Sequence, residues 1–166
     1  MTTVVTEDQV HQALNLWHQG DAQGTPLADL LLWQQAQIKG ALNVRRATNQ
    51  LLLDALAALA SEDPQAQRVL ELRFLREETG QQIANAMHWA EGTVWRKQRE
   101  AIARLTTIIQ TQEAAAHAAR LARFAGRLPG DTGATLFGID AHLAALTAQI
   151  NHRDAPWILA IEGIGG

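Results

Sequence analysis

The stretch RVLELRFLREETGQQIANAMHWAEGTVWRKQREAIARL, residues 68–105, carries the pattern that decides the fold. A leading helical segment is followed by a short helix, GQQIANAM, a three-residue turn, HWA, and a longer helix that begins at Glu91. Thr79 and Gln82 have capping-box spacing, in which each side chain bonds the backbone N–H of the other residue. The pattern predicts two helices joined by a tight turn, which is the arrangement of a helix-turn-helix.

Apolar residues predict how these two helices pack. Ile83, Ala84 and Met87 of the short helix are expected to meet Trp89 of the turn and Val94 of the second helix. Such a small core holds the helices at a steep angle. It leaves the second helix protruding enough to enter a DNA major groove.

The second helix has a packed face and an opposite, basic face when its residues are placed at intervals of about 100°. The residues expected to pack inward are Val94, Gln98, Ala101, Ile102 and Leu105. The opposite face carries Gly92, Arg96, Arg99 and Ala103, with Thr93 and Trp95 beside it. Arginines there would bind phosphates or form paired hydrogen bonds with guanine. A basic helix face is about as often plain solvated surface, and that interpretation stays open.

The same stretch resembles region four of bacterial sigma factors and the related response-regulator type of helix-turn-helix. LELRFLREETGQQIA corresponds to the leading helix and scaffold, and EGTVWRKQREAIARL corresponds to the recognition helix. The resemblance implies a compact helical DNA-binding module, with DNA contacts at Thr79, Gln81, Thr93, Trp95, Arg96 and Arg99. The chain departs from the family at His88, where glycine is favoured, and at Ala90, where a serine caps the helix and often binds a phosphate.

Further helices are predicted on both sides of this stretch. Upstream, capping signals at Thr6 with Gln9 and at Thr25-Pro26 predict helices that end at Gly20 and Gly40, followed by a third over 41–60 and a fourth opened by Asp63-Pro64. Downstream, no glycine or proline interrupts residues 93–125, which predicts one long helix or two with a soft joint. This run is expected to pack on the N-terminal helices, with a dimerising or signal-transmitting helix as the alternative.

A linker and a change of pattern follow the helical part. Gly126, Pro129, Gly130 and Gly133 mark the linker, and a helix over 140–150 and a strand over 157–161 then predict the start of an α/β unit. The strand is followed by the first part of a phosphate-binding loop: Gly163, Ile164, Gly165 and Gly166. The lysine, the hydroxyl group and the helix that complete such a loop are missing. We therefore expect no enzyme activity and no cofactor for this chain.

Residues 135–166 resemble the opening of the nucleotide-binding domain of NB-ARC-type signalling ATPases, the STAND group. TLFGIDAHLAALTAQI followed by APWILAIEGIGG carries the resemblance, and Ile139 stands where that family usually has an arginine. The resemblance implies that the chain is the N-terminal part of a longer regulator, truncated inside its Walker A motif. The full-length parent is then an NTPase that binds ATP or ADP together with Mg²⁺.

Composition excludes several classes of protein. The 166 residues are 47% hydrophobic, which suits a packed core. The net charge of −3 argues against a protein that binds nucleic acid over its whole surface. The absence of cysteine excludes disulfide scaffolds and thiolate chemistry. None of the six histidines is expected to pair with a suitably placed carboxylate four residues away, so no metal site is expected. No signal peptide or membrane span is recognisable, and a cytoplasmic protein without membrane contact is expected.

Together these patterns predict an all-α helical domain over 1–127 with a helix-turn-helix core at 68–105, a linker over 128–135, and an incomplete α/β segment over 136–166 that starts a P-loop NTPase domain. The expected function is that of a DNA-binding regulatory module in a nucleotide-dependent STAND-type regulator. Protein contacts or self-association through the helical domain are further expected interactions. The alternative is a protein-interaction adaptor of the same ATPase that does not bind DNA.

Overall fold

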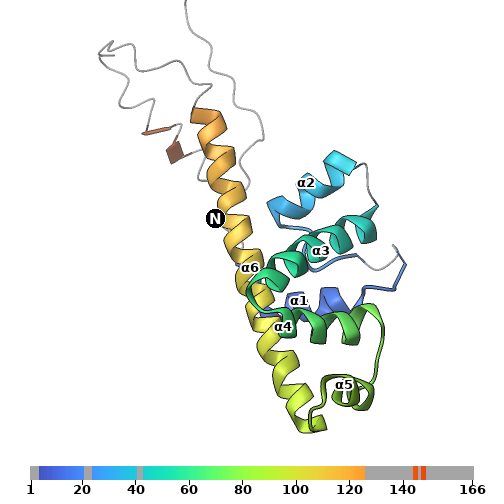
Figure 1. Cartoon of the computed structure of the whole chain (residues 1–166). Coiled ribbons are helices and arrows are strands. Elements are labelled where there is room, and N and C mark those ends of the chain that lie inside the picture. The colour runs from blue at the N-terminus through green and yellow to red at the C-terminus, as the bar shows by residue number, and fades with distance from the viewer. Residues whose placement is uncertain (1–3, 21–23, 41–42, 126–143, 146, 149–166) are drawn as a thin grey trace, which may run out of the picture. The chain divides into compact units, whose positions relative to one another are not determined.

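The computed structural model describes residues 4–20, 24–40, 43–125, 144–145 and 147–148 (Figure 1). The chain divides into two units, Met1–Arg127 and Leu128–Gly166. Within the second unit only Ala144, Ala145, Thr147 and Ala148 are described, and they are helical. The predicted linker, strand and phosphate loop at Gly163–Gly166 lie outside the described residues.

The first unit is built from helices, and its described residues contain no strand, which confirms the predicted all-α domain there. In chain order the elements are α1 (Glu7–Asn15), α2 (Leu31–Gly40), α3 (Val44–Glu62), α4 (Pro64–Leu70), the π-helical turn η1 (Glu71–Leu75), α5 (Gly80–Met87) and α6 (Glu91–Ala125). No described helix is both long enough and apolar enough to cross a membrane.

Helix starts follow the predicted capping signals at three places. Capping boxes open α1 at Thr6 and α5 at Thr79, each with a glutamine three residues later. Asp63 caps α4, where its Oδ1 accepts a hydrogen bond from the backbone N–H of Ala66 at 3.0 Å. These signals are local, because the bonded groups stand three residues apart, and the sequence therefore shows them directly.

Three helix boundaries differ from the prediction. The first helix ends at Asn15 instead of near Gly20, and the third begins at Val44, after a cap supplied by Asn43. The second begins at Leu31, because residues 26–29 form a turn and a carboxylate from another helix holds the new start. That carboxylate is Glu113 of α6, which accepts hydrogen bonds from the backbone N–H groups of Leu31 at 2.7 Å and Leu32 at 3.0 Å.

The long helix α6 runs without a break over 35 residues and is the longest helix among the described residues of the first unit (Figure 1). It packs against α1, α2, α3 and α4, so the interpretation that it packs on the chain's own N-terminal helices holds. Leu105 and Ile109 of α6 are fully buried in the main core, together with Leu14, Leu52 and Leu59 from the other helices. Burial on α6 ends at Glu113, and the turns beyond it are mostly exposed.

Candidate nucleic-acid interface

A second, smaller core fixes the two helices of the helix-turn-helix. Ile83 and Ala84 of α5, Val94 of α6 and Leu72 of η1 are buried together, and Met87 and Trp89 pack against them. The predicted core is therefore confirmed, with Leu72 added from the leading helix. The close approach also depends on Gly80, since a Cβ atom there would lie 3.1 Å from Cζ2 of the Trp95 ring.

The turn between α5 and α6 places His88 in the left-handed region, with φ 55° and ψ 43°. The backbone N–H groups of His88 and Trp89 bond back to the carbonyl oxygens of Asn85 at 3.3 Å and Ala84 at 2.9 Å, which closes the end of α5. This backbone conformation explains why glycine is favoured at the position, because a Cβ atom is disfavoured there.

Replacing His88 with glycine is expected to stabilise the fold. Removing the Cβ atom relieves the left-handed strain, and the gain exceeds the entropy that glycine adds to the unfolded chain, leaving about 0.5–1 kcal/mol. Urea denaturation followed by circular dichroism measures the change. His88→Ala is the matched control, since it removes the imidazole but keeps the Cβ atom. Equal effects of the two substitutions would contradict the backbone explanation.

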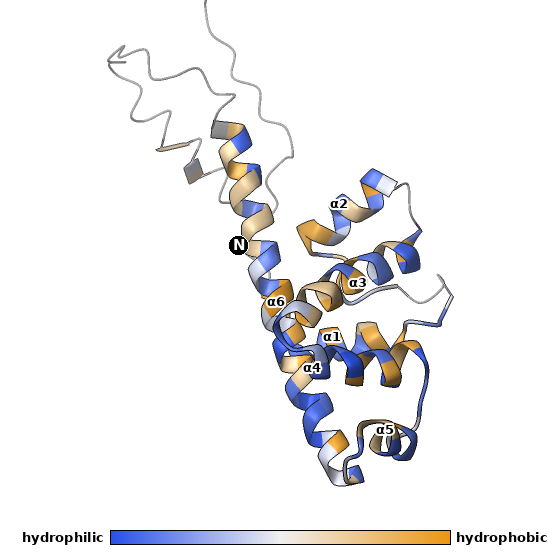
Figure 2. Cartoon of the chain, viewed as in Figure 1, coloured by the Kyte–Doolittle hydropathy of each residue, from blue (hydrophilic) through white to orange (hydrophobic). Residues whose placement is uncertain are grey.

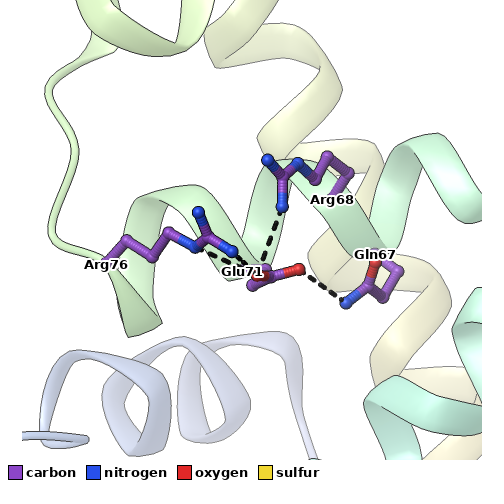
Figure 3. A network of polar contacts seen from close by, with 4 residues as sticks. All are labelled: Gln67, Arg68, Glu71 and Arg76. Carbon is purple, nitrogen blue, oxygen red and sulfur yellow. Dashed lines mark hydrogen bonds and ion pairs between the residues drawn. The ribbon is translucent and has the colours of Figure 1, made fainter. Parts of the chain in front are cut away.

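A polar network holds together the end of α4 and the π-helical turn η1, which precede α5. Glu71 accepts hydrogen bonds from Arg76 at 2.8 and 3.0 Å, from Arg68 at 3.2 Å and from Gln67 at 3.2 Å (Figure 3). Burial raises the pKa of Glu71, but the hydrogen bonds from Gln67 and Arg76 and the charges of Arg68 and Arg76 outweigh it and hold the pKa below its ordinary value. The carboxylate therefore stays ionised at neutral pH and keeps both arginines in place.

The π-helical turn and the recognition helix are joined through Arg73. Its guanidinium donates a hydrogen bond to the carbonyl oxygen of Glu78 at 3.0 Å and lies 5.5 Å from the centre of the Trp95 ring. A cation over an indole face is attracted by the electron density of the ring. Trp95 is thus held between Arg73 and Gly80 while 45% of it stays exposed.

The structure places the six predicted DNA-contacting residues at the N-cap and first turn of α5 and in the first turns of α6. Five of them are exposed and one, Thr93, is half-buried; the exposed ones are Thr79, Gln81, Trp95, Arg96 and Arg99. On α6 the inward face is buried as predicted, at Val94, Gln98, Ala101, Ile102 and Leu105. Figure 2 shows the first turns of α6 as mostly hydrophilic. We call the surface formed by these six residues the cationic face.

The two arginines of the cationic face make few contacts with other side chains. Arg96 lies 4.0 Å from Glu100, which Lys97 also contacts at 3.0 Å, and both pairs are solvent-exposed. The hydrogen bond from Lys97, opposed by slight desolvation and aided by the charges of Lys97, Arg96 and Arg104, holds the pKa of Glu100 below its ordinary value. Arg99 has no ion pair among the described residues. Exposed ion pairs contribute little energy, so both arginines are available to a phosphate.

An acidic turn lies beside the cationic face, and it was not predicted from the sequence. Glu7, Asp8 and His11 of α1 line a hollow of about 410 Å³ together with Trp95 and Arg99 of α6. The two carboxylates suit the positive end of α1, and on that ground alone they need no further role. Only the packing of α1 against α6 brings them next to Arg99.

One prediction about histidine is wrong. His117 and Glu113 are four residues apart on α6, and His117 Nε2 lies 3.0 Å from a Glu113 carboxylate oxygen. The pair serves the start of α2, because the same carboxylate accepts the N–H groups of Leu31 and Leu32. Within the described residues no group of three or more histidine or acidic side chains is placed to hold a metal ion.

Comparison with known proteins gives one family match. The family model for Sigma-70, region 4 matches residues 50–106, which extend from α3 through the helix-turn-helix into α6. Domains of that family are helix-turn-helix modules that bind DNA. No curated protein and no solved structure matches the chain.

Proposed function

We propose that residues 50–106 form a DNA-binding module of a transcriptional regulator, with the first turns of α6 as its recognition helix. The observation that carries the proposal is the exposure of Arg96 and Arg99 on a helix whose opposite face is buried. The match of residues 50–106 to Sigma-70, region 4 supports it. In this arrangement the arginines contact DNA phosphates or guanine edges, and Thr79 and Gln81, at the start of α5, approach the DNA backbone.

The test is duplex binding as a function of salt. Fluorescence anisotropy with a labelled duplex of about 30 base pairs, from about 50 to 200 mM salt, should show affinity falling with salt, because phosphate contacts release counterions. We expect the slope of log K against log salt to be about −2 or steeper, with about one unit for each arginine. Absence of binding to any duplex at about 50 mM salt would favour the adaptor function instead.

The adaptor is the second candidate because the surface near the recognition helix is partly acidic. The chain carries a net charge of −3, and Glu7 and Asp8 stand beside Arg99. In this alternative the module keeps its fold and binds a protein. The salt experiment separates the two functions.

We further propose that this module belongs to a nucleotide-dependent STAND-type regulator, in which ATP/ADP exchange controls how the helical module is presented. Support comes from the sequence alone, through the order of the predicted helix, the predicted strand and the Gly-rich segment over residues 135–166. The coding sequence that follows Gly166 tests this proposal. Ile-Gly-Lys-Thr would complete a Walker A loop, and a sequence without that lysine would reject the proposal.

Replacing Ala90 with serine is expected to strengthen both the fold and DNA binding. The backbone N–H of Thr93 now bonds the Ala90 carbonyl oxygen at 2.9 Å, and alanine has no side-chain acceptor for the first turn of α6. A serine cap should add about 1 kcal/mol of stability and a hydroxyl group beside the cationic face. Thermal denaturation and the anisotropy assay measure the two effects. Ala114→Ser, at an exposed position inside α6, should instead destabilise slightly.

Neutralising the acidic turn of α1 is expected to tighten DNA binding. The double substitution Glu7→Gln and Asp8→Asn removes two negative charges beside Arg99, and affinity should rise by about threefold to tenfold at low salt, because screening is then weakest. Asp29→Asn with Asp54→Asn is the matched control, with the same charge change at exposed positions in the 26–29 turn and on α3. An equal gain from both pairs would mean that net charge, not the position of α1, sets the affinity.

A further inference from the structure

A groove lies between α2 and the last turns of α6, away from the helix-turn-helix. It encloses about 360 Å³. One wall is formed by Gln34, Gln35 and Ile38 of α2, and the other by Arg120, Arg123 and Phe124 of α6. Leu31, which is buried, completes the lining. We call this feature the α2–α6 groove; it lies outside the residues that match the family model.

Large apolar side chains gather at this end of the unit. Ile38 is 80% exposed, Phe124 is 54% exposed and Leu121, on the same turn of α6, is 69% exposed. These are three of the six large hydrophobic residues that are exposed within the described part of the chain. Exposed apolar residues that cluster beside a concave surface mark interaction sites more often than scattered ones do.

The rim of the α2–α6 groove is positively charged. The guanidinium of Arg120 lies 5.8 Å from the centre of the Phe124 ring, and Arg123 Nε donates to the carbonyl oxygen of Ala119 at 3.4 Å. No carboxylate is among the described residues that line the groove. Neither arginine has an ion-pair partner in the described part of the chain.

We propose that the α2–α6 groove is a docking site for an amphipathic helix of another protein, with acidic residues flanking its apolar face. Bulky apolar side chains of the partner would cover Ile38 and Phe124, and its carboxylates would pair with Arg120 and Arg123. Helix-in-groove recognition uses this combination of spaced apolar anchors and a complementary charged rim. The volume of about 360 Å³ lies near the lower end of ligand pockets and suits a few anchoring side chains.

Two other occupants, a second copy of the chain and a nucleic acid, fit the α2–α6 groove less well. In a symmetric dimer through this groove the same patch meets itself, so arginines would face arginines and repel. A nucleic acid would satisfy Arg120 and Arg123 but would leave the apolar side chains of Ile38 and Phe124 uncovered. An acidic, amphipathic protein helix satisfies both sets of residues.

Two synthetic peptides of about 18 residues test the proposal with the full chain. Both carry leucines at helical a and d positions; one has glutamate and the other lysine at the flanking positions. The acidic peptide should bind at least about tenfold more tightly than the basic one by fluorescence anisotropy. Binding should fall by about tenfold or more in Arg120→Glu with Arg123→Glu, and also in Phe124→Ala, which removes the apolar anchor without changing charge.

The matched control is Arg96→Glu with Arg99→Glu, which has the same charge reversal on the same helix. It should leave acidic-peptide binding unchanged within about twofold, while it abolishes DNA binding. Equal binding of the two peptides, or equal losses in the two double variants, would overturn the proposal. Displacement of the acidic peptide by duplex DNA in Arg96→Glu with Arg99→Glu, whose cationic face no longer binds DNA, would assign the groove to nucleic acid. Protection of Phe124 from hydroxyl-radical oxidation in the free chain would show that the chain itself fills the groove.

Discussion

Glu113→Ala is expected to lower the free energy of unfolding by about 3 kcal/mol, because it removes the acceptor for two charge-assisted hydrogen bonds. Glu113 is 2% exposed, and its two carboxylate oxygens accept the N–H groups of Leu31 and Leu32. Without the carboxylate the first N–H groups of α2 lose their partners in a buried setting. Part of the loss is offset because a buried charge is no longer desolvated.

Denaturation in urea measures this loss, and hydrogen exchange locates it. The amides of Leu31 and Leu32 should exchange much faster in Glu113→Ala, because their bonds are made across two helices. Glu113→Gln is the control, since it keeps one acceptor oxygen and a similar shape and should cost about half as much. A loss below about 1 kcal/mol in Glu113→Ala would mean that water or a shifted backbone satisfies these amides.

Arg96→Ala with Arg99→Ala is expected to weaken duplex binding by about tenfold to a hundredfold at low salt and to reduce the salt slope by about two units. Both side chains lie on the exposed side of α6, and the only ion pair that either of them makes among the described residues is the weak contact of Arg96 with Glu100 at 4.0 Å. Each phosphate contact that is lost removes about one unit of slope, so the slope counts contacts directly.

The control for this variant lies on the same helix. Arg120→Ala with Arg123→Ala makes the same change in net charge at exposed positions in the last turns of α6. Its slope should match that of the unchanged chain. An equal reduction of the salt slope in both variants would mean that DNA affinity depends on the overall charge of the chain. The cationic face would then not be the DNA-binding surface.

Much of the helix-turn-helix could be predicted because its determinants are close together in the sequence. The Thr79 and Gln82 capping box, the small core around Ile83 and Val94, and the inward face of α6 depend on residues a few positions apart. Helical periodicity then places Arg96 and Arg99 on the outside.

The features that could not be predicted depend on packing between distant segments. Glu113 and Leu31 are separated by 82 positions, so nothing near Leu31 in the sequence shows what caps α2. In the same way, the acidic turn of α1 reaches Arg99 only through the packing of α1 on α6. Helical periodicity does not predict the π-helical turn at Glu71–Leu75. Its extra residue changes the helical register without requiring particular residue types.

Site-specific photo-cross-linking to duplex DNA tests the central claim most directly. Gly92 is the position of choice, since it is exposed on the outer side of α6 and a Cβ atom there meets nothing within 4 Å. A photoreactive amino acid in place of Gly92 should cross-link to the duplex, and the same group in place of the exposed Ala118 should not. DNA binding with cross-links at position 118, or at neither position, would contradict the claim that the first turns of α6 read DNA.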